Sequence, residues 1–172
     1  QSVRPKPRQT FLGAPGAILS GARRLTTFIR DGSYWVATGQ TQQGPTVPNP
    51  WEACRTLFPR CGHPEDLFID HRVLRHVSTL AAVEPGTWFF DYAADRIFLV
   101  DDPSGRRVET SVTPHAFVAN FATNVTITGL TIEKYATPAP KGAIEAWAGW
   151  RVEGNELRWN HNAAIRTGGH EV

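Results

Sequence analysis

The sequence has 172 residues, of which 41% are hydrophobic and 20% are charged, and its formal net charge is +2. These values are typical of a globular protein, and they argue against intrinsic disorder and against a dedicated nucleic-acid-binding protein. The 15 glycines and 13 prolines recur throughout the chain, which favours a β protein rich in turns.

No apolar run approaches the roughly 18 residues that a membrane span needs, so no membrane span is expected. Residues 1–5 contain no hydrophobic core of a signal peptide. The chain contains no methionine, so Gln1 is not expected to be a translation start. We therefore expect a processed chain or a fragment of a longer protein.

Helical periodicity is nearly absent, whereas short runs of β-branched and aromatic residues are separated by Gly, Pro, Asn and Asp, which predicts an all-β fold. Residues 9–30 place glycine and other small residues between apolar ones, as in short strands that meet at tight corners. We predict that residues 1–30 form the N-terminal strands. Residues 31–64, with Gly44-Pro45 and Pro48-Asn49-Pro50, are expected to form a long loop.

Two antiparallel hairpins are predicted in the next segment. Residues 67–70 and 73–74 flank a short reversal, and residues 86–92 and 96–100 flank a second turn at 93–95. Residues 31–112 are therefore predicted to form a loop and an antiparallel β insertion.

The last sixty residues contain an internal repeat. Residues 124–133 align with residues 149–158 at an offset of 25, and Gly129 then coincides with Gly154. Residues 142–146 align with residues 163–167 at an offset of 21. This period is too short for a propeller blade but fits one rung of a parallel β-helix, in which each rung is stabilised by its neighbours. Residues 113–172 are therefore predicted to be β-helix rungs.

The repeat predicts which side chains point inward and which rungs pair. The inward set is Val125, Ile127, Ile132, Ile144, Trp150, Val152, Leu157 and Ile165. The outward set is Thr126, Thr128, Glu133, Arg151, Glu153 and Arg158. Stacking at these offsets places Glu133 beside Arg158 and Glu145 beside Arg166, about 4.8 Å apart along the stack. Each ion pair should add about 0.2–1 kcal/mol and help to fix the register.

Residues 13–21, 67–70, 85–91 and 129–155 resemble the right-handed parallel β-helix proteins of bacteria, the pectate-lyase-like superfamily. The resemblance implies such a β-helix, with an antiparallel β-hairpin insertion in its first rungs. This scaffold hosts lyases, hydrolases, epimerases and noncatalytic surface proteins. Lyases of the superfamily pair clustered carboxylates that hold Ca²⁺ with a Lys or Arg base. No such cluster matches here, so no catalytic position is transferred, and Ca²⁺ would be a cofactor of the full-length protein only.

Cys54 and Cys61 are the only cysteines. In an oxidising compartment two cysteines so close in a loop indicate a disulfide. Free buried thiols and a metal site are the alternatives. A zinc site would need four ligands, and His63 supplies only one more at this spacing, so no metal site is predicted.

The candidates for catalysis form a weak set. His161 lies in a predicted turn that a sugar could reach. Glu145, Lys134 and Arg166 could act as acid, base or anion ligand on an outer sheet, although a solvated face with ion pairs is the favoured alternative.

Tryptophan rings stack on sugar faces, so an exposed pair of Trp147 and Trp159 is a candidate carbohydrate platform. Trp150 aligns with Val125 and is predicted to lie in the core. Asn155, Asn160 and Asn162 could bind a glycan, but side-chain bonds to turn backbone are the commoner use of Asn.

These observations together predict the N-terminal part of an exported bacterial β-helix protein, extracellular or periplasmic, that acts on polysaccharide by lyase or hydrolase chemistry. The resemblance implies an active site in the central rungs, which are expected beyond Val172. We expect the chain to continue there, because no helix follows residues 165–167 to cover the last strands. The alternative is a noncatalytic β-helix module for surface adhesion or glycan binding. A glycan or polysaccharide partner, no nucleic acid and a monomer are expected.

Overall fold

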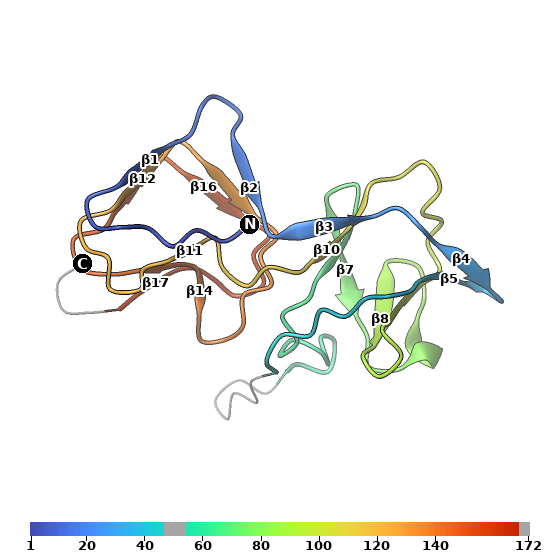
Figure 1. Ribbon diagram of the computed structural model, residues 1–172. Coiled ribbons are helices and arrows are strands. Elements are labelled where there is room, and N and C mark those ends of the chain that lie inside the picture. Colours follow the sequence, from blue (N-terminus) through green and yellow to red (C-terminus); the bar gives the residue numbers. More distant parts are fainter. Residues whose placement is uncertain (47–53, 169–172) are drawn as a thin grey trace. The chain divides into compact units, whose positions relative to one another are not determined.

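The computed structural model of the protein describes residues 1–46 and 54–168 (Figure 1). These residues form short strands and one 3₁₀ helix, η1 (Leu80–Ala82), with no α-helix among them. The predicted all-β fold is confirmed. No helix in this part of the chain is long and apolar enough to cross a membrane.

The chain divides into two compact units. Unit 1 combines Gln1–Ala22 with Val112–Val172, and unit 2 is Arg23–Ser111. The first division therefore falls after residue 22, whereas the sequence predicted it after residue 30. The difference arises because β3 (Ala22–Leu25) and β4 (Ile29–Asp31) are both strands of the sheet of unit 2, where β3 pairs with β10 and β4 pairs with β5.

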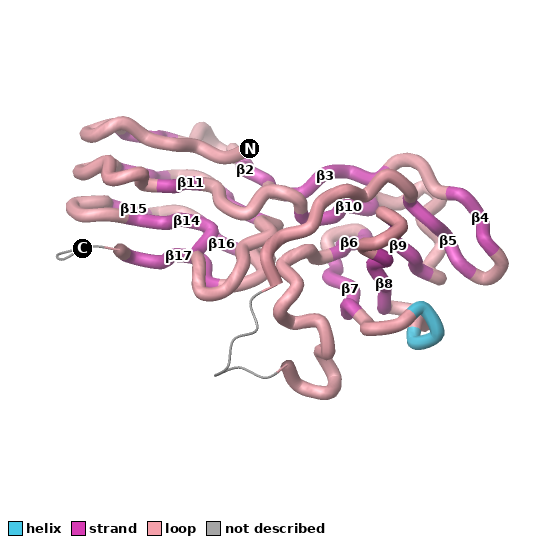
Figure 2. Tube along the Cα trace, turned by 60° about the horizontal axis from the view of Figure 1, so that its bottom comes forward, coloured by secondary structure: helices cyan, strands magenta, loops and turns pink. Residues whose placement is uncertain are grey.

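Unit 1 consists of three parallel sheets of three strands each, and successive passes of the chain lie one above another (Figure 2). The first sheet contains β1 (Thr10–Leu12), β12 (Thr126–Thr128) and β15 (Arg151–Glu153). The second contains β2 (Ile18–Ser20), β13 (Thr131–Glu133) and β16 (Glu156–Arg158). The third contains β11 (Phe117–Val118), β14 (Gly142–Ala146) and β17 (Ala163–Thr167).

The predicted strand register of unit 1 is confirmed. Ile127 pairs with Val152, and Glu133 pairs with Arg158, both at an offset of 25. Glu145 pairs with Arg166 at an offset of 21. The charged side chains also meet: Arg158 Nε lies 2.8 Å from Glu133 Oε2, and Arg166 Nη1 lies 3.2 Å from Glu145 Oε2.

The apolar side chains predicted to point inward build the core of unit 1 with one exception, Ile165, and one residue predicted to point outward, Glu133, is buried. Val125, Ile127, Ile132, Ile144 and Trp150 are buried, and Val152 and Leu157 pack against them. Ile165 is 39% exposed, because among the described residues β17 pairs with β14 alone. Glu133, predicted to face outward, is only 2% exposed. Arg158 and Lys134 lie against its carboxylate.

The corners of unit 1 recur at the same offset as its strands. Residues in the left-handed backbone region follow one another 25 residues apart, and the pairs are Asn124 with Gly149, Gly129 with Gly154, and Lys134 with Trp159. Asn155 and Asn160 directly follow two of these corners. Their side chains form hydrogen bonds with the backbone of the preceding pass, 25 residues earlier in the chain. Asn155 Oδ1 accepts the Leu130 N–H at 3.0 Å, and Asn160 Oδ1 accepts the Tyr135 N–H at 3.0 Å. The turn-backbone use predicted for both asparagines is therefore confirmed.

Unit 2 is built on an eight-stranded sheet in the order β3-β10-β6-β7-β8-β9-β5-β4. Its remaining strands are β5 (Tyr34–Ala37), β6 (Leu67–Ile69), β7 (Arg72–His76), β8 (Thr87–Asp91), β9 (Arg96–Leu99) and β10 (Val108–Ser111). The two predicted hairpins are β6–β7 and β8–β9. The prediction of purely antiparallel pairing was wrong at β7 and β8, which run parallel. Parallel neighbours need a crossover connection rather than a tight turn, and η1 lies in that connection.

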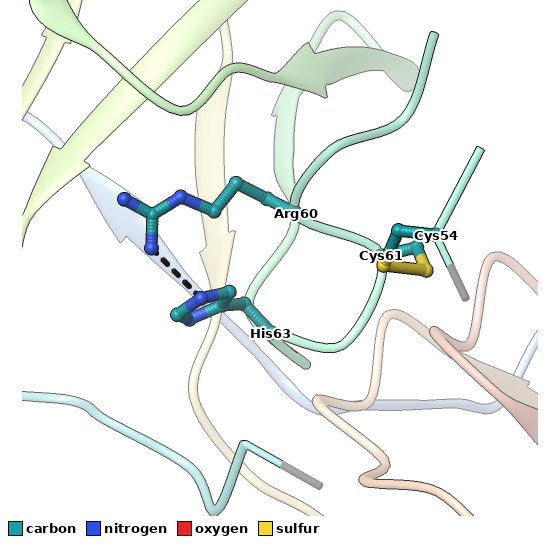
Figure 3. Close-up of a disulfide and its surroundings, with 4 residues drawn as sticks. All are labelled: Cys54, Arg60, Cys61 and His63. Carbon is teal, nitrogen blue, oxygen red and sulfur yellow. Dashed lines mark hydrogen bonds between the residues drawn. A yellow bond between two sulfur atoms is a disulfide. The ribbon is translucent and has the colours of Figure 1, made fainter. Parts of the chain in front are cut away.

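A disulfide closes a small loop in unit 2 (Figure 3). It joins Cys54 to Cys61 with the Cα atoms 5.5 Å apart, and this confirms the predicted pairing over free thiols. Arg60 and His63 lie beside it, with Arg60 Nη1 2.8 Å from His63 Nε2.

Candidate functional site

Three of the predicted site residues, Glu145, Trp147 and Arg166, line one depression of unit 1. Its volume is about 210 Å³. The other lining residues are 118–121, Lys141, Ala146 and Gly168. We call this depression the Glu145 groove. It lies along the sheet of β11, β14 and β17, because Glu145 and Arg166 are paired residues of β14 and β17.

The carboxylate of Glu145 is held by three groups. Its Oε1 accepts the Gly142 N–H at 2.6 Å, and its Oε2 lies 3.2 Å from Arg166 Nη1 and 3.5 Å from Lys141 Nζ. The side chain of Glu145 is 15% exposed, whereas both cations are nearly half exposed. These contacts hold the carboxylate in one place, where its remaining lone pairs can accept hydrogen bonds from a ligand.

Two aromatic rings form the apolar part of the groove. The rings of Phe121 and Trp147 meet edge to face, with centroids 5.5 Å apart. Phe121 is 76% exposed, which is unusual for so large an apolar side chain. Asn120 and Phe121 both have a left-handed backbone, with φ of 44° and 65°. Bulky residues rarely adopt this conformation, and such strain concentrates at functional sites.

The other predicted residues lie at a different corner, which β13 and β16 enter. Lys134 is fully buried, so its predicted place on an open outer face was wrong. Its Nζ lies 3.5 Å from Glu133 Oε1 and 5.2 Å from the Trp159 ring centroid. The Arg158 guanidinium lies 4.4 Å from the same ring. The hydrogen bond to Glu133 raises the pKa of Arg158 above its ordinary value.

The structure does not bring together the two tryptophans of the predicted carbohydrate platform. Trp147 follows β14 and contacts Phe121, whereas Trp159 follows β16 and is covered by cations. His161 lies at this second corner, where its backbone N–H donates to the Tyr135 backbone carbonyl at 3.1 Å. His161 and Lys134 are not among the residues that line the Glu145 groove.

Phe121 and Lys141 were not predicted from the sequence as members of the groove. From the sequence alone, an exposed phenylalanine cannot be distinguished from a buried one. The available signal was Asn120, because asparagine favours left-handed turns. In the described part of the chain no group of three or more His, Cys, Asp or Glu side chains could hold a metal ion.

Unit 2 has its own cluster of buried polar and aromatic groups. Tyr92 donates its hydroxyl to Glu65 Oε2 at 2.9 Å, and Glu65 also accepts the Gly44 N–H. Burial raises the pKa of Tyr92 well above its ordinary value. The Tyr92 ring stacks on His63 and Phe90, at 5.1 Å and 4.1 Å between centroids. These contacts tie the loop after Cys61 to the sheet.

One solved structure is similar to this chain among the known proteins compared with it. No protein-family model matches the sequence, and no curated protein matches it significantly. Among solved structures the chain is similar to XylC, whose structure was determined in complex with xylose. The TM-score is 0.70 at 16% sequence identity over the whole of this chain. The chain spans 35% of the length of XylC.

Proposed function

We propose that this chain is a right-handed parallel β-helix that belongs to an exported protein acting on polysaccharide, and that its Glu145 groove binds a sugar unit. The β-helix proposal is supported by parallel pairing at offsets of 25 and 21 in the three sheets of unit 1. The left-handed corners at the same spacing support it independently.

The observation that carries the sugar-binding proposal is the exposed Phe121–Trp147 pair beside fixed charges. Small-ligand sites combine apolar and aromatic walls with a few convergent polar groups. The C–H faces of a pyranose ring pack on aromatic rings, while Glu145, Lys141 and Arg166 offer an acceptor and donors to its hydroxyls. The xylose bound by the similar XylC makes xylose and xylo-oligosaccharides the first ligands to test.

Binding, rather than bond cleavage, is the role that we propose for this groove. Glu145 is occupied by Gly142, Lys141 and Arg166, and general acid–base catalysis needs a carboxyl group that is free to exchange a proton. Lyase or hydrolase chemistry is proposed for the whole protein, at residues outside this groove. A noncatalytic glycan-binding module is the alternative.

Export to an extracellular or periplasmic location is proposed on the disulfide. Disulfides form and persist in oxidising compartments and are rare in the cytosol, and both cysteines of this chain are paired in the structure.

The binding proposal is tested by calorimetry of the full chain with xylose, xylo-oligosaccharides and a panel of neutral oligosaccharides. We expect Phe121→Ala and Trp147→Ala each to weaken binding about tenfold, which corresponds to about 1.4 kcal/mol. Trp159→Ala is the matched control, because it removes a partly exposed ring outside the groove, and it should bind like the parent chain. Failure of every sugar to bind, or equal binding by Phe121→Ala, would contradict the proposal.

The catalytic proposal needs a different measurement. The full-length protein is incubated with the polysaccharide that binds best, and new reducing ends and unsaturated products are followed. Unsaturated products indicate a lyase, and reducing ends alone indicate a hydrolase. Binding without either product supports the noncatalytic alternative.

A further inference from the structure

Unit 2 contains an opening of about 360 Å³, which we call the Trp35 opening. It is lined by residues 24–26, Phe28, Trp35 and the turn 103–106. Its volume lies in the range of about 300–1,000 Å³ that is usual for small-ligand sites.

The opening follows from the order of strands in the sheet of unit 2. The two edge strands, β3 and β4, are consecutive in the chain and are joined by residues 26–28. The connection from β9 to β10 supplies the turn 103–106 to the same opening. Strand β3, its connection to β4, strand β5 and the turn 103–106 therefore contribute to the lining.

The turn 103–106 is fixed before any ligand arrives. Asp102 Oδ1 accepts the Ser104 N–H at 2.9 Å, and the Arg106 N–H donates to the Pro103 carbonyl at 3.1 Å. Asp70 Oδ2 accepts from Arg106 Nε at 2.8 Å. A site that is ordered in advance loses less conformational entropy on binding.

The charges that line the opening have one sign. Among the described lining residues the charged side chains are Arg24 and Arg106, and none is a carboxylate. Arg30 adds a third cation nearby, since its guanidinium lies 4.9 Å from the Trp35 ring centroid. Hydrogen bonds lower the pKa of Asp70, through Arg106, and of Asp102, through Ser104. Three cations therefore lie at or beside the opening, and one of them, Arg106, also pairs with Asp70.

The apolar lining is aromatic and rigid. Phe28 and Trp35 are partly buried and pack against the core of unit 2. Arg30 lies over the Trp35 ring but is not among the residues that line the opening. The opening thus combines an aromatic wall with guanidinium groups, which bind carboxylate and sulfate well.

We propose that the Trp35 opening binds an anionic saccharide unit, with the sugar ring against Phe28 and Trp35 and the carboxylate or sulfate on Arg24 and Arg106. This site lies wholly in unit 2 and stands whether or not the Glu145 groove binds sugar. It would let one chain hold a polysaccharide through an acidic substituent as well as through a neutral ring.

The test uses the full chain with four probes: glucuronate, glucose 6-sulfate, glucose and inorganic sulfate. We expect at least one anionic sugar to bind more tightly than both glucose and inorganic sulfate, and its affinity to fall with rising salt. The tighter of glucuronate and glucose 6-sulfate identifies the anionic group. Binding of that sugar should shift the Trp35 indole resonance in two-dimensional NMR spectra.

Arg24→Gln should weaken binding of that anionic sugar roughly fivefold, as expected for a partly solvated guanidinium contact. Arg151→Gln is the control, since it removes an exposed arginine of unit 1, and it should not change the affinity. Loss of the Trp35 indole shift in Arg24→Gln separates this site from the Glu145 groove. The proposal fails if neither anionic sugar outbinds glucose, if inorganic sulfate binds as tightly, or if Arg24→Gln has no effect.

Discussion

Replacing Asn155 by alanine tests how the passes of unit 1 are held together. The side chain of Asn155 bridges two passes: its Oδ1 accepts the Leu130 N–H at 3.0 Å, and its Nδ2 donates to the Ile127 carbonyl at 2.8 Å. A further bond runs to the Glu153 carbonyl at 3.0 Å on the exposed side. Alanine removes all three bonds and leaves backbone groups of the neighbouring pass without this partner.

The expected loss of stability follows from the two partly buried bonds. A hydrogen bond contributes a net of about 0.5–1.5 kcal/mol, so Asn155→Ala should lower the free energy of unfolding of unit 1 by about 1–3 kcal/mol. The exposed bond to Glu153 should add little, because water replaces it. Locally, the protection of the Leu130 amide against hydrogen exchange should fall roughly tenfold.

Native-state hydrogen exchange followed by NMR is the decisive assay, because it reports on the Leu130 amide directly. Asn162→Ala is the matched control, since that side chain makes one exposed bond, to the Lys141 carbonyl at 3.1 Å. It should cost less than about 0.5 kcal/mol. An unchanged exchange rate at Leu130 in Asn155→Ala would refute the bridging role, as would equal destabilisation by both variants.

Three further predictions concern unit 1. Arg158→Gln should lower the free energy of unfolding by about 3 kcal/mol, since it takes the closest cation from the buried carboxylate of Glu133. Gly149→Ala should cost about 2–4 kcal/mol, because φ is +71° and a Cβ would overlap the Asn124 side chain. Burial raises the pKa of Tyr135 from 10.0 to about 12, so this phenol stabilises the fold below pH 10, and that stability is lost as the pH rises toward 12.

Urea unfolding with matched controls checks these three predictions. Arg151→Gln breaks an exposed pair with Glu153 and should cost less than about 0.5 kcal/mol. Gly16→Ala meets open space at φ +80°, so it should cost only the backbone penalty of about 1–2 kcal/mol. Tyr135→Phe should remove part of the alkaline loss of stability. The argument for Glu133 is contradicted if Arg158→Gln lowers the free energy of unfolding no more than Arg151→Gln does. The argument for Gly149 is contradicted if Gly149→Ala costs no more than Gly16→Ala. The argument for Tyr135 is contradicted if Tyr135→Phe loses as much stability at alkaline pH as the parent chain.

The strand register of unit 1 could be predicted because two kinds of signal coincide in the sequence. Alternating apolar residues such as Ile127 and Val152 align at the offset at which Gly129 meets Gly154, and the charges of Glu133 and Arg158 then match. A slip of one residue would reverse all the side chains at once. Few registers satisfy these conditions together, so the alignment was well determined.

Other features depend on tertiary contacts that a pattern does not encode. Alternation assigned Glu133 to the outer side of its strand, but it does not tell what packs over that side, and Glu133 is buried. The boundary after Ala22 was missed because β2 and β3 are separated by Gly21 alone, with no loop between them. The corner at Gly154 is marked in the sequence by its glycine. The left-handed corners at Lys134 and Trp159 have no glycine, so the sequence does not mark them.

The candidate site was predicted in part, for a related reason. Glu145 and Arg166 were placed side by side by the repeat, and Trp147 follows directly on the same strand. Phe121 and Lys141 come from connections whose paths the repeat does not determine. Trp147 and Trp159 could not be distinguished in the sequence. The exposure of each ring depends on neighbours such as Arg158, which lies over the Trp159 ring only in the folded chain.

The connections between the sheets of unit 1 differ in how much length variation they accept. Between β12 and β13, and again between β15 and β16, the connection is two residues. From β13 to β14 the chain uses residues 134–141, but from β16 to β17 it uses only residues 159–162. The corresponding connection after β2 contains the whole of unit 2. The connections from the third sheet to the first also differ, with residues 119–125 after β11 and residues 147–150 after β14. Insertions and deletions are therefore tolerated at both ends of the third sheet. Because Lys141 ends one such connection and lines the Glu145 groove, changes in loop length there can alter ligand preference while every strand keeps its register.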